Sequence, residues 1–183
     1  KLKKLFLESG FYNYVSTSNL NKKLSRNMLH KEADYKVRPG IAKDACIYGM
    51  KHALDSIKPF EPLYEILIEC MQNTNNHASS NEKQRHKWWL FVYNDEESGV
   101  SKYSFLDLGV GIFESLALKN LLRRTAKDVG LLPNTHFVKD LLNGKIQSRV
   151  AKDNEIRGKG IPQIVDHSKY GEFKEFKIIT NDV

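Results

Sequence analysis

Two adjacent runs of β-branched and aromatic residues constrain the fold of this chain more than any other feature. They read KWWLFVYND and VSKYSFLDLG, and the short polar stretch DEESG separates them. Two such runs joined by a few residues that include a glycine predict an antiparallel hairpin. The chain is therefore expected to contain a sheet, and its remaining segments must supply the elements that pack on that sheet.

Helical patterns stand on both sides of the hairpin. Apolar residues recur at three- and four-residue intervals over 41–57, which predicts an amphipathic helix. A second helix is expected over about 62–78, with a proline in its first turn. The other expected elements are a short helix and an irregular arm within 1–40, helical segments at 113–129 and 137–142, a helix that starts at Pro162, and a last strand in EFKEFKIITNDV. This order predicts an α+β two-layer sandwich with helices on one face of a mixed or antiparallel sheet.

The composition limits the classes of protein. A length of 183 residues fits one ordinary domain, and 40% hydrophobic with 28% charged residues is typical of a soluble globular protein. No apolar run approaches the roughly 18 residues that a membrane span needs, and the start KLKKLFLESGF lacks the apolar core of a signal peptide. Two cysteines give no disulfide framework and no paired metal motif, so a cytoplasmic location is expected. Because the chain begins without Met, we expect it to be a fragment of a larger protein.

The net charge of +7 favours an anionic partner, which could be a nucleotide, a nucleic acid or an acidic protein surface. Basic residues of the amino-terminal arm and of the segment after the hairpin are interleaved with acidic ones. Such mixed charge is more typical of a solvated surface than of a nucleic-acid interface. Nucleic-acid binding therefore ranks below the other possibilities.

A row of polar residues crosses the helix expected over 62–78. Glu69, Asn73 and His77 follow one another at four-residue spacing, which places them on one side of a helix. A carboxylate can orient or deprotonate a water, and an amide oxygen is a hard ligand suited to Mg²⁺. Taken singly, a surface charge for Glu69 and a cap or core histidine for His77 are the simpler interpretations.

A second motif, DLGVGI, ends the hairpin. Asp107 is followed by Gly109 and Gly111, and these glycines let the backbone approach a flat ligand while the carboxylate accepts a hydrogen bond from its edge. An adenine amine is such an edge. By itself the pattern is also typical of an ordinary turn after a strand.

A third motif, RGKGIPQIVD, precedes the last expected helix. Gly158 and Gly160 would allow phosphate oxygens to reach the unpaired amides and the positive dipole end of that helix, and Arg157 and Lys159 would add charge. The motif is neither a Walker loop nor a dinucleotide fingerprint, because the glycine spacing differs. A glycine-rich loop into a core helix remains the alternative.

In this order, ExxxNxxxHA, DxGxGI and RGxGIxxIV resemble the motifs of the GHKL superfamily of ATPases and kinases. Its members share the Bergerat ATP-binding fold and include gyrase B, the ninety-kilodalton heat-shock chaperone, MutL and the catalytic domain of sensor histidine kinases. The resemblance is nearest to histidine-kinase-like ATPase domains. It implies an ATP-binding domain over 58–183 with a lid at about 113–156, and it leaves 1–57 as an amino-terminal helical extension packed on that domain.

The resemblance also implies a role for each matching residue. Asn73 would coordinate Mg²⁺, Asp107 would bind the adenine amine, and Glu69 would act as the general base of an ATPase or assist phosphotransfer in a kinase. The other residues implied to bind the nucleotide are His77, Gly109, Gly111, Ile112, Arg149, Arg157, Gly158, Lys159, Gly160, Ile161 and Thr180.

The chain departs from the family pattern in several respects. Kinase members often carry a basic residue three positions after the magnesium-binding Asn, where this chain has Asn76. A phosphate contact must then come from Arg149, Arg157 or Lys159. The lid also lacks the usual phenylalanine-rich box.

The expected function is therefore that of an ATP·Mg-binding domain which hydrolyses ATP or transfers its γ-phosphate within a larger signalling or stress protein. The alternative is a non-catalytic module in which bound nucleotide changes a protein interface formed by residues 1–57. A histidine kinase needs a phosphoacceptor histidine on a helical hairpin. His30 and His52 lack that setting, so the phosphoacceptor is left open.

Overall fold

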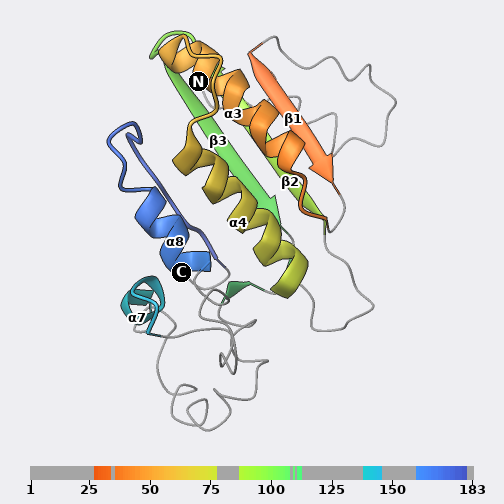
Figure 1. Cartoon of the computed structure of the whole chain (residues 1–183), viewed down its shortest axis with the longest axis vertical. Helices are drawn as coiled ribbons and strands as arrows, with labels where there is room; N and C mark the ends of the chain where they lie inside the picture. Colours follow the sequence, from red (N-terminus) through yellow and green to blue (C-terminus); the bar gives the residue numbers. More distant parts are fainter. Residues whose placement is uncertain are drawn as a thin grey trace, which may run out of the picture.

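A computed structural model describes residues 27–33, 36–77, 87–107, 109, 111–112, 138–145 and 160–180. It has an α+β fold in which a three-stranded antiparallel sheet is covered by helices on one face (Figure 1), which confirms the predicted fold class. The elements are β1 Met28–Ala33, α3 Pro39–Leu54, α4 Glu61–His77, β2 Trp88–Asp95, β3 Val100–Asp107, α7 Val138–Leu142 and α8 Gly160–His167.

The predicted hairpin is confirmed as β2 and β3. Trp88 pairs with Asp107 at the open end and Asp95 with Val100 beside the turn. Gly99 closes the turn with a φ of 64°, a left-handed conformation that favours glycine, and its amide donates to the Asp95 carbonyl at 2.9 Å. The hairpin thereby fixes Asp107 at the end of β3 opposite the turn.

The expectation of a short helix and an irregular arm within 1–40 is wrong over Met28–Ala33, which forms β1 and pairs antiparallel with β2. The segment MLHKEA has neither a regular alternation of apolar residues nor strong strand formers. It becomes a strand because β2 offers it a row of backbone hydrogen-bonding partners. The order of strands in the sheet is β1, β2, β3.

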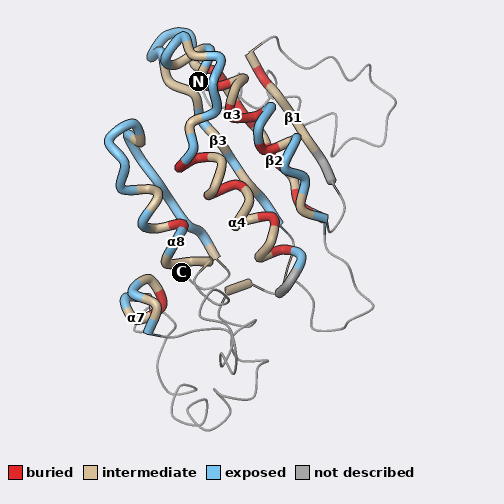
Figure 2. The backbone as a smooth tube through the Cα atoms, viewed as in Figure 1, coloured by how far each residue is buried: buried red, intermediate tan, exposed pale blue. Residues whose placement is uncertain are grey.

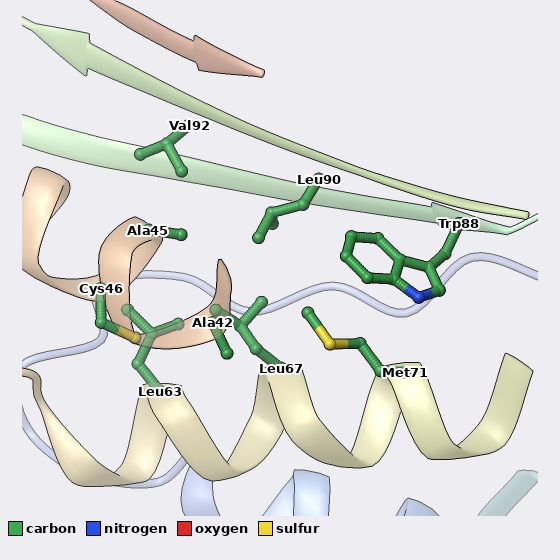
Figure 3. Packing of buried hydrophobic residues seen from close by; sticks show 9 residues of the cluster. All are labelled: Ala42, Ala45, Cys46, Leu63, Leu67, Met71, Trp88, Leu90 and Val92. Carbon is green, nitrogen blue, oxygen red and sulfur yellow. The ribbon is translucent and has the colours of Figure 1, made fainter. Parts of the chain in front are cut away.

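The core lies between the sheet and the two long helices. Alternate residues of β2 are buried toward α3 and α4, while the residues between them are only partly buried. Figure 2 shows buried positions on α3 and α4, and Figure 3 shows nine core side chains meeting between these helices and β2. They are Ala42, Ala45, Cys46, Leu63, Leu67, Met71, Trp88, Leu90 and Val92. The core thus draws on residues on both sides of position 57.

Small residues let α3 lie close to the sheet. Ala42 and Ala45 have no exposed surface, and Gly49 packs against the Tyr103 hydroxyl of β3. The helix ends at Leu54, before the predicted 57, because Asp55 adopts a left-handed conformation with a φ of 48°. Pro59 lies beyond this helix end, and Pro62 is in the first turn of α4. The second long helix, α4, agrees with its prediction to within one residue at each end.

The carboxy-terminal region differs from its prediction. Residues 172–180 of the segment EFKEFKIITNDV form no strand, although α8 forms as expected and begins at Gly160, ahead of Pro162. Ile179 is 86% exposed and Phe176 and Ile178 are each 37% exposed, so little apolar burial holds this segment against the sheet. A pattern of strand-forming residues does not make a strand where the backbone has no ladder to join.

Of the two helical segments expected between the hairpin and α8, only the second can be compared. It is observed as the short helix α7, whereas 113–129 lies outside the described residues. No helix in the described part of the chain has the length and apolar character to cross a membrane.

Candidate functional site

Two residues of the polar row on α4, Glu69 and Asn73, face α8. Glu69 and Asn73 lie one turn apart on α4, both are partly buried, and α4 packs directly against α8 (Figure 1). On this side α4 thus presents a carboxylate and an amide to another helix in place of apolar side chains. Polar groups kept in a partly buried interface favour a binding role over simple packing.

Gly160, the first residue of α8, lies directly against these two side chains. A Cβ atom at this position would be 3.0 Å from Asn73 Oδ1 and 3.0 Å from Glu69 Oε2. The absence of a side chain is therefore what lets the start of α8 approach the row so closely. Two of the three sequence motifs, far apart in the chain, meet at this point.

The environment of Glu69 changes its acidity. Burial raises the pKa of its carboxyl group above the ordinary value of 4.5, the neighbouring carboxylate of Glu65 raises it further, and His167 on α8 lowers it. A carboxyl group with a raised pKa holds a proton more readily than a surface one. Such a group is suited to accept a proton from water or from a hydroxyl.

Asp107 ends β3 beside the same helix. Its Oδ1 accepts a hydrogen bond of 2.8 Å from the amide of Gly109, which turns the chain after the strand. Desolvation raises the pKa of the Cys70 thiol to about 12, and the negative charges of Asp107 and Glu69 add to this effect. Asp107 therefore lies close enough to α4 for its charge to act there.

The rest of the glycine motif is tied to the carboxy-terminal segment. Gly111 has a φ of 87°, in the left-handed region that favours glycine, and Ile112 follows it. The amide of Ile112 donates a 3.2 Å hydrogen bond to Thr180 Oγ1. Thr180 thus lies beside the loop after β3, on a segment that forms no strand over 172–180.

Several predicted site residues cannot be placed. His77 is the last residue of α4, and its side chain lies outside the description. Ile161, by contrast, is placed: it lies in the first turn of α8 and is partly buried. The expected phosphate ligands Arg149, Arg157, Gly158 and Lys159 lie outside the described residues, as does most of the 113–156 segment expected to form a lid.

Two residues that the sequence reasoning did not include act on the site. Glu65 stands four residues before Glu69, so the same helical spacing that identified the row could have found it. His167 contributes from α8 only because that helix packs on α4, and its Nδ1 is buried. No local pattern in the sequence indicates this histidine.

A separate hollow of about 520 Å³ lies at the other end of the sheet, lined by Asp44, Ile47, Tyr48, Lys51, His52 and Asn94. Several of its polar groups serve the fold. The Asn94 amide donates to the Tyr48 carbonyl and accepts from the Ser101 hydroxyl, and His52 Nε2 lies 3.2 Å from the Asp95 carbonyl. We therefore place the candidate site at Glu69 and Asn73.

No family model matches the chain, and comparisons with curated proteins and with solved structures likewise found no match. The function must therefore be argued from the site geometry together with the sequence motifs.

Proposed function

We propose that this chain binds ATP with Mg²⁺ between α4, the end of β3 and the start of α8. The observation that carries the proposal is the contact of Gly160 with Glu69 and Asn73. It brings the amide-rich start of a helix to a carboxylate and an amide oxygen. Helix starts favour phosphate, and oxygen ligands favour Mg²⁺, so the two halves of the site suit the two parts of one ligand.

The donor set fits such a ligand. Asn73 offers one amide oxygen to the metal, and no three His, Cys, Asp or Glu side chains gather as a metal site among the described residues. Mg²⁺ commonly completes its shell with waters and substrate phosphates, so one or two protein ligands are enough. Asp107 uses Oδ1 for the Gly109 amide, and its second oxygen can accept from an adenine amine.

Glu69 would take the proton from the group that attacks the γ-phosphate. Its raised pKa makes it a suitable acceptor for the proton of a water or of a hydroxyl on a partner. Bound ATP·Mg would supply the γ-phosphoryl group. The chain would then be an ATPase or a phosphotransferase of the histidine-kinase-like kind. A non-catalytic module that changes a partner interface when nucleotide binds is the second candidate.

Calorimetric titration with ATP, with and without Mg²⁺, tests binding. We expect heat of binding with the intact chain and its loss in Asn73→Ala. The matched control is Asn75→Ala, an identical change at an exposed position of the same helix. Equal affinity of Asn73→Ala and Asn75→Ala would overturn the proposed site.

Release of γ-phosphate separates the enzyme from the module. Glu69→Gln should abolish turnover and preserve ATP binding, whereas Glu61→Gln, at the exposed start of α4, should leave both intact. A chain that binds ATP tightly and has no turnover attributable to Glu69 is a binding module.

A further inference from the structure

A short segment after α8 has an unpaired backbone. Residues 174–179 read KEFKII, follow the turn after α8 and belong to none of the three strands. Within the described part of the chain, no backbone hydrogen bond involves any of these six residues. Their amides and carbonyls are therefore open to pairing with another strand.

The side chains of this segment are also exposed to solvent. Ile179 is 86% exposed, and Phe176 and Ile178 are each 37% exposed (Figure 2). Lys177 and Glu175 form an ion pair of 2.8 Å, and their side chains are 68% and 69% exposed. An exposed, unpaired stretch with aromatic and β-branched residues is a surface on which another strand can add.

The order of charges favours a second copy of this chain as that strand. In an antiparallel pair centred on Phe176, this residue lies opposite the partner's Phe176, and Glu175 lies opposite the partner's Lys177. The two-fold axis repeats the charge pair, because Lys177 then lies opposite the partner's Glu175. Opposite charges and aromatic rings placed directly across an antiparallel pair stabilise it.

The local net charge favours the same place. Because the chain has a net charge of +7, two copies in general repel each other. The stretch 172–177 contains two Glu and two Lys, so it has no net charge. Two copies can therefore meet at this stretch without that repulsion.

We propose that residues 174–179 are an association surface on which a second copy of this chain pairs as an antiparallel strand centred on Phe176. The paired stretch is short, so the dimer is weak and depends on protein concentration. Its formation does not require bound nucleotide.

Association would act beside the candidate site. The segment leads into Thr180, whose Oγ1 accepts a 3.2 Å hydrogen bond from the Ile112 amide. Pairing of 174–179 would restrain Thr180 and, through this bond, the loop after β3.

Sedimentation velocity tests the association. The intact chain should form dimers as its concentration is raised to roughly 0.5 mM, the range in which a small interface is populated. Lys177→Glu creates two like-charge contacts in the dimer and should weaken it roughly tenfold or more. Lys169→Glu is the matched control, because Lys169 is also 68% exposed and also pairs with a carboxylate. A chain that stays monomeric, or equal effects of the two substitutions, would overturn the proposal.

Mixing two variants tests the charge pairs themselves. Glu175→Lys alone and Lys177→Glu alone should each lose self-association, since each places like charges opposite one another. In an equimolar mixture, every charge of one variant lies opposite the other sign, so heterodimers should form. Circular dichroism verifies that both variants are folded. Failure of the folded variants to associate on mixing would contradict the pairing.

Disulfide formation tests the register. Phe176→Cys places the thiol opposite its own copy and should give a covalent dimer under mild oxidation. Ile179→Cys would lie ~20 Å from its copy in the same pair, too far for a disulfide. The unsubstituted chain sets the background from Cys46 and Cys70. Equal yields from positions 176 and 179, or no dimer above background from position 176, would exclude this antiparallel pairing.

Discussion

The oxygens of Glu69 and Asn73 converge on the space that a side chain at position 160 would fill. That space is small, since both oxygens are 3.0 Å from the ideal Cβ position, closer than methyl groups ordinarily pack. Geometry at the site therefore depends on one missing methyl group. The site also contains the Glu69 carboxyl group, whose pKa is raised by burial, so its charged form is disfavoured.

Gly160→Ala should weaken ATP·Mg binding and leave the fold intact. The added methyl group must push the Asn73 and Glu69 side chains aside, and we expect a loss of affinity of about tenfold, or ~1.4 kcal/mol. Calorimetric titration measures it. Gly171→Ala is the matched control, because a Cβ there meets nothing within 4 Å. Equal affinities of the two variants would show that the close approach does not matter for binding.

Glu69→Gln should stabilise the folded chain at about pH 7 and have little effect below about pH 4. The pKa of Glu69 is raised in the folded state, so its contribution to stability is fully present below the unfolded pKa and is lost as the pH rises through the folded pKa. Glutamine stays neutral and avoids this loss. Urea unfolding at both pH values measures the difference, and a variant that is less stable at the higher pH would contradict it.

At the scale of elements, β2 organises the molecule. It pairs with both other strands and turns Trp88, Leu90 and Val92 toward the helices. Buried residues alternate along β2 with the period of two that a strand has. The apolar residues of α3 and α4 recur with the period of a helix. Each element is thus amphipathic in its own geometry, and the three apolar surfaces meet in one core (Figure 3).

Leu90→Ala should destabilise the chain far more than Leu106→Ala. Leu90 has no exposed surface, and its truncation leaves a cavity that costs about 2–5 kcal/mol. Leu106, its matched control on the neighbouring strand, is 49% exposed and should lose well under half of that amount. Denaturant unfolding of both variants measures the two losses, and similar values would mean that the core is not where Figure 3 places it.

The whole molecule brings together segments that are distant in the sequence. The Ile112 amide and the Thr180 hydroxyl are 68 residues apart in the chain and 3.2 Å apart in space. This bond connects the glycine loop after β3 to the carboxy-terminal segment, which forms no strand over 172–180. The loop that carries Gly109 and Gly111 is thus held in part from outside the hairpin.

Thr180→Val should weaken nucleotide binding because the Ile112 amide loses its acceptor. A typical hydrogen bond contributes about 0.5–1.5 kcal/mol, which corresponds to a loss of affinity of roughly two- to tenfold. Thr180→Ser keeps the hydroxyl and should bind as the intact chain does. Titration with ADP measures all three proteins. If Thr180→Val and Thr180→Ser bind equally, the hydroxyl does not hold the loop for binding.

The sequence determined the elements whose side-chain pattern matches their own geometry. The hairpin followed from two strand-forming runs around a glycine, and α3 and α4 followed from apolar spacing. The four-residue spacing of Glu69 and Asn73 likewise required only a helix. These are local properties, so neighbouring residues suffice to predict them.

Only the tertiary structure decided the features that depend on a distant partner. MLHKEA became β1 because β2 lay beside it, and residues 172–180, with a better strand pattern, formed none. The contact of Gly160 with Asn73 and the effect of His167 on Glu69 arise from the packing of α8 on α4. Backbone pairing and side-chain burial are shared between segments, so neither segment's own sequence contains them.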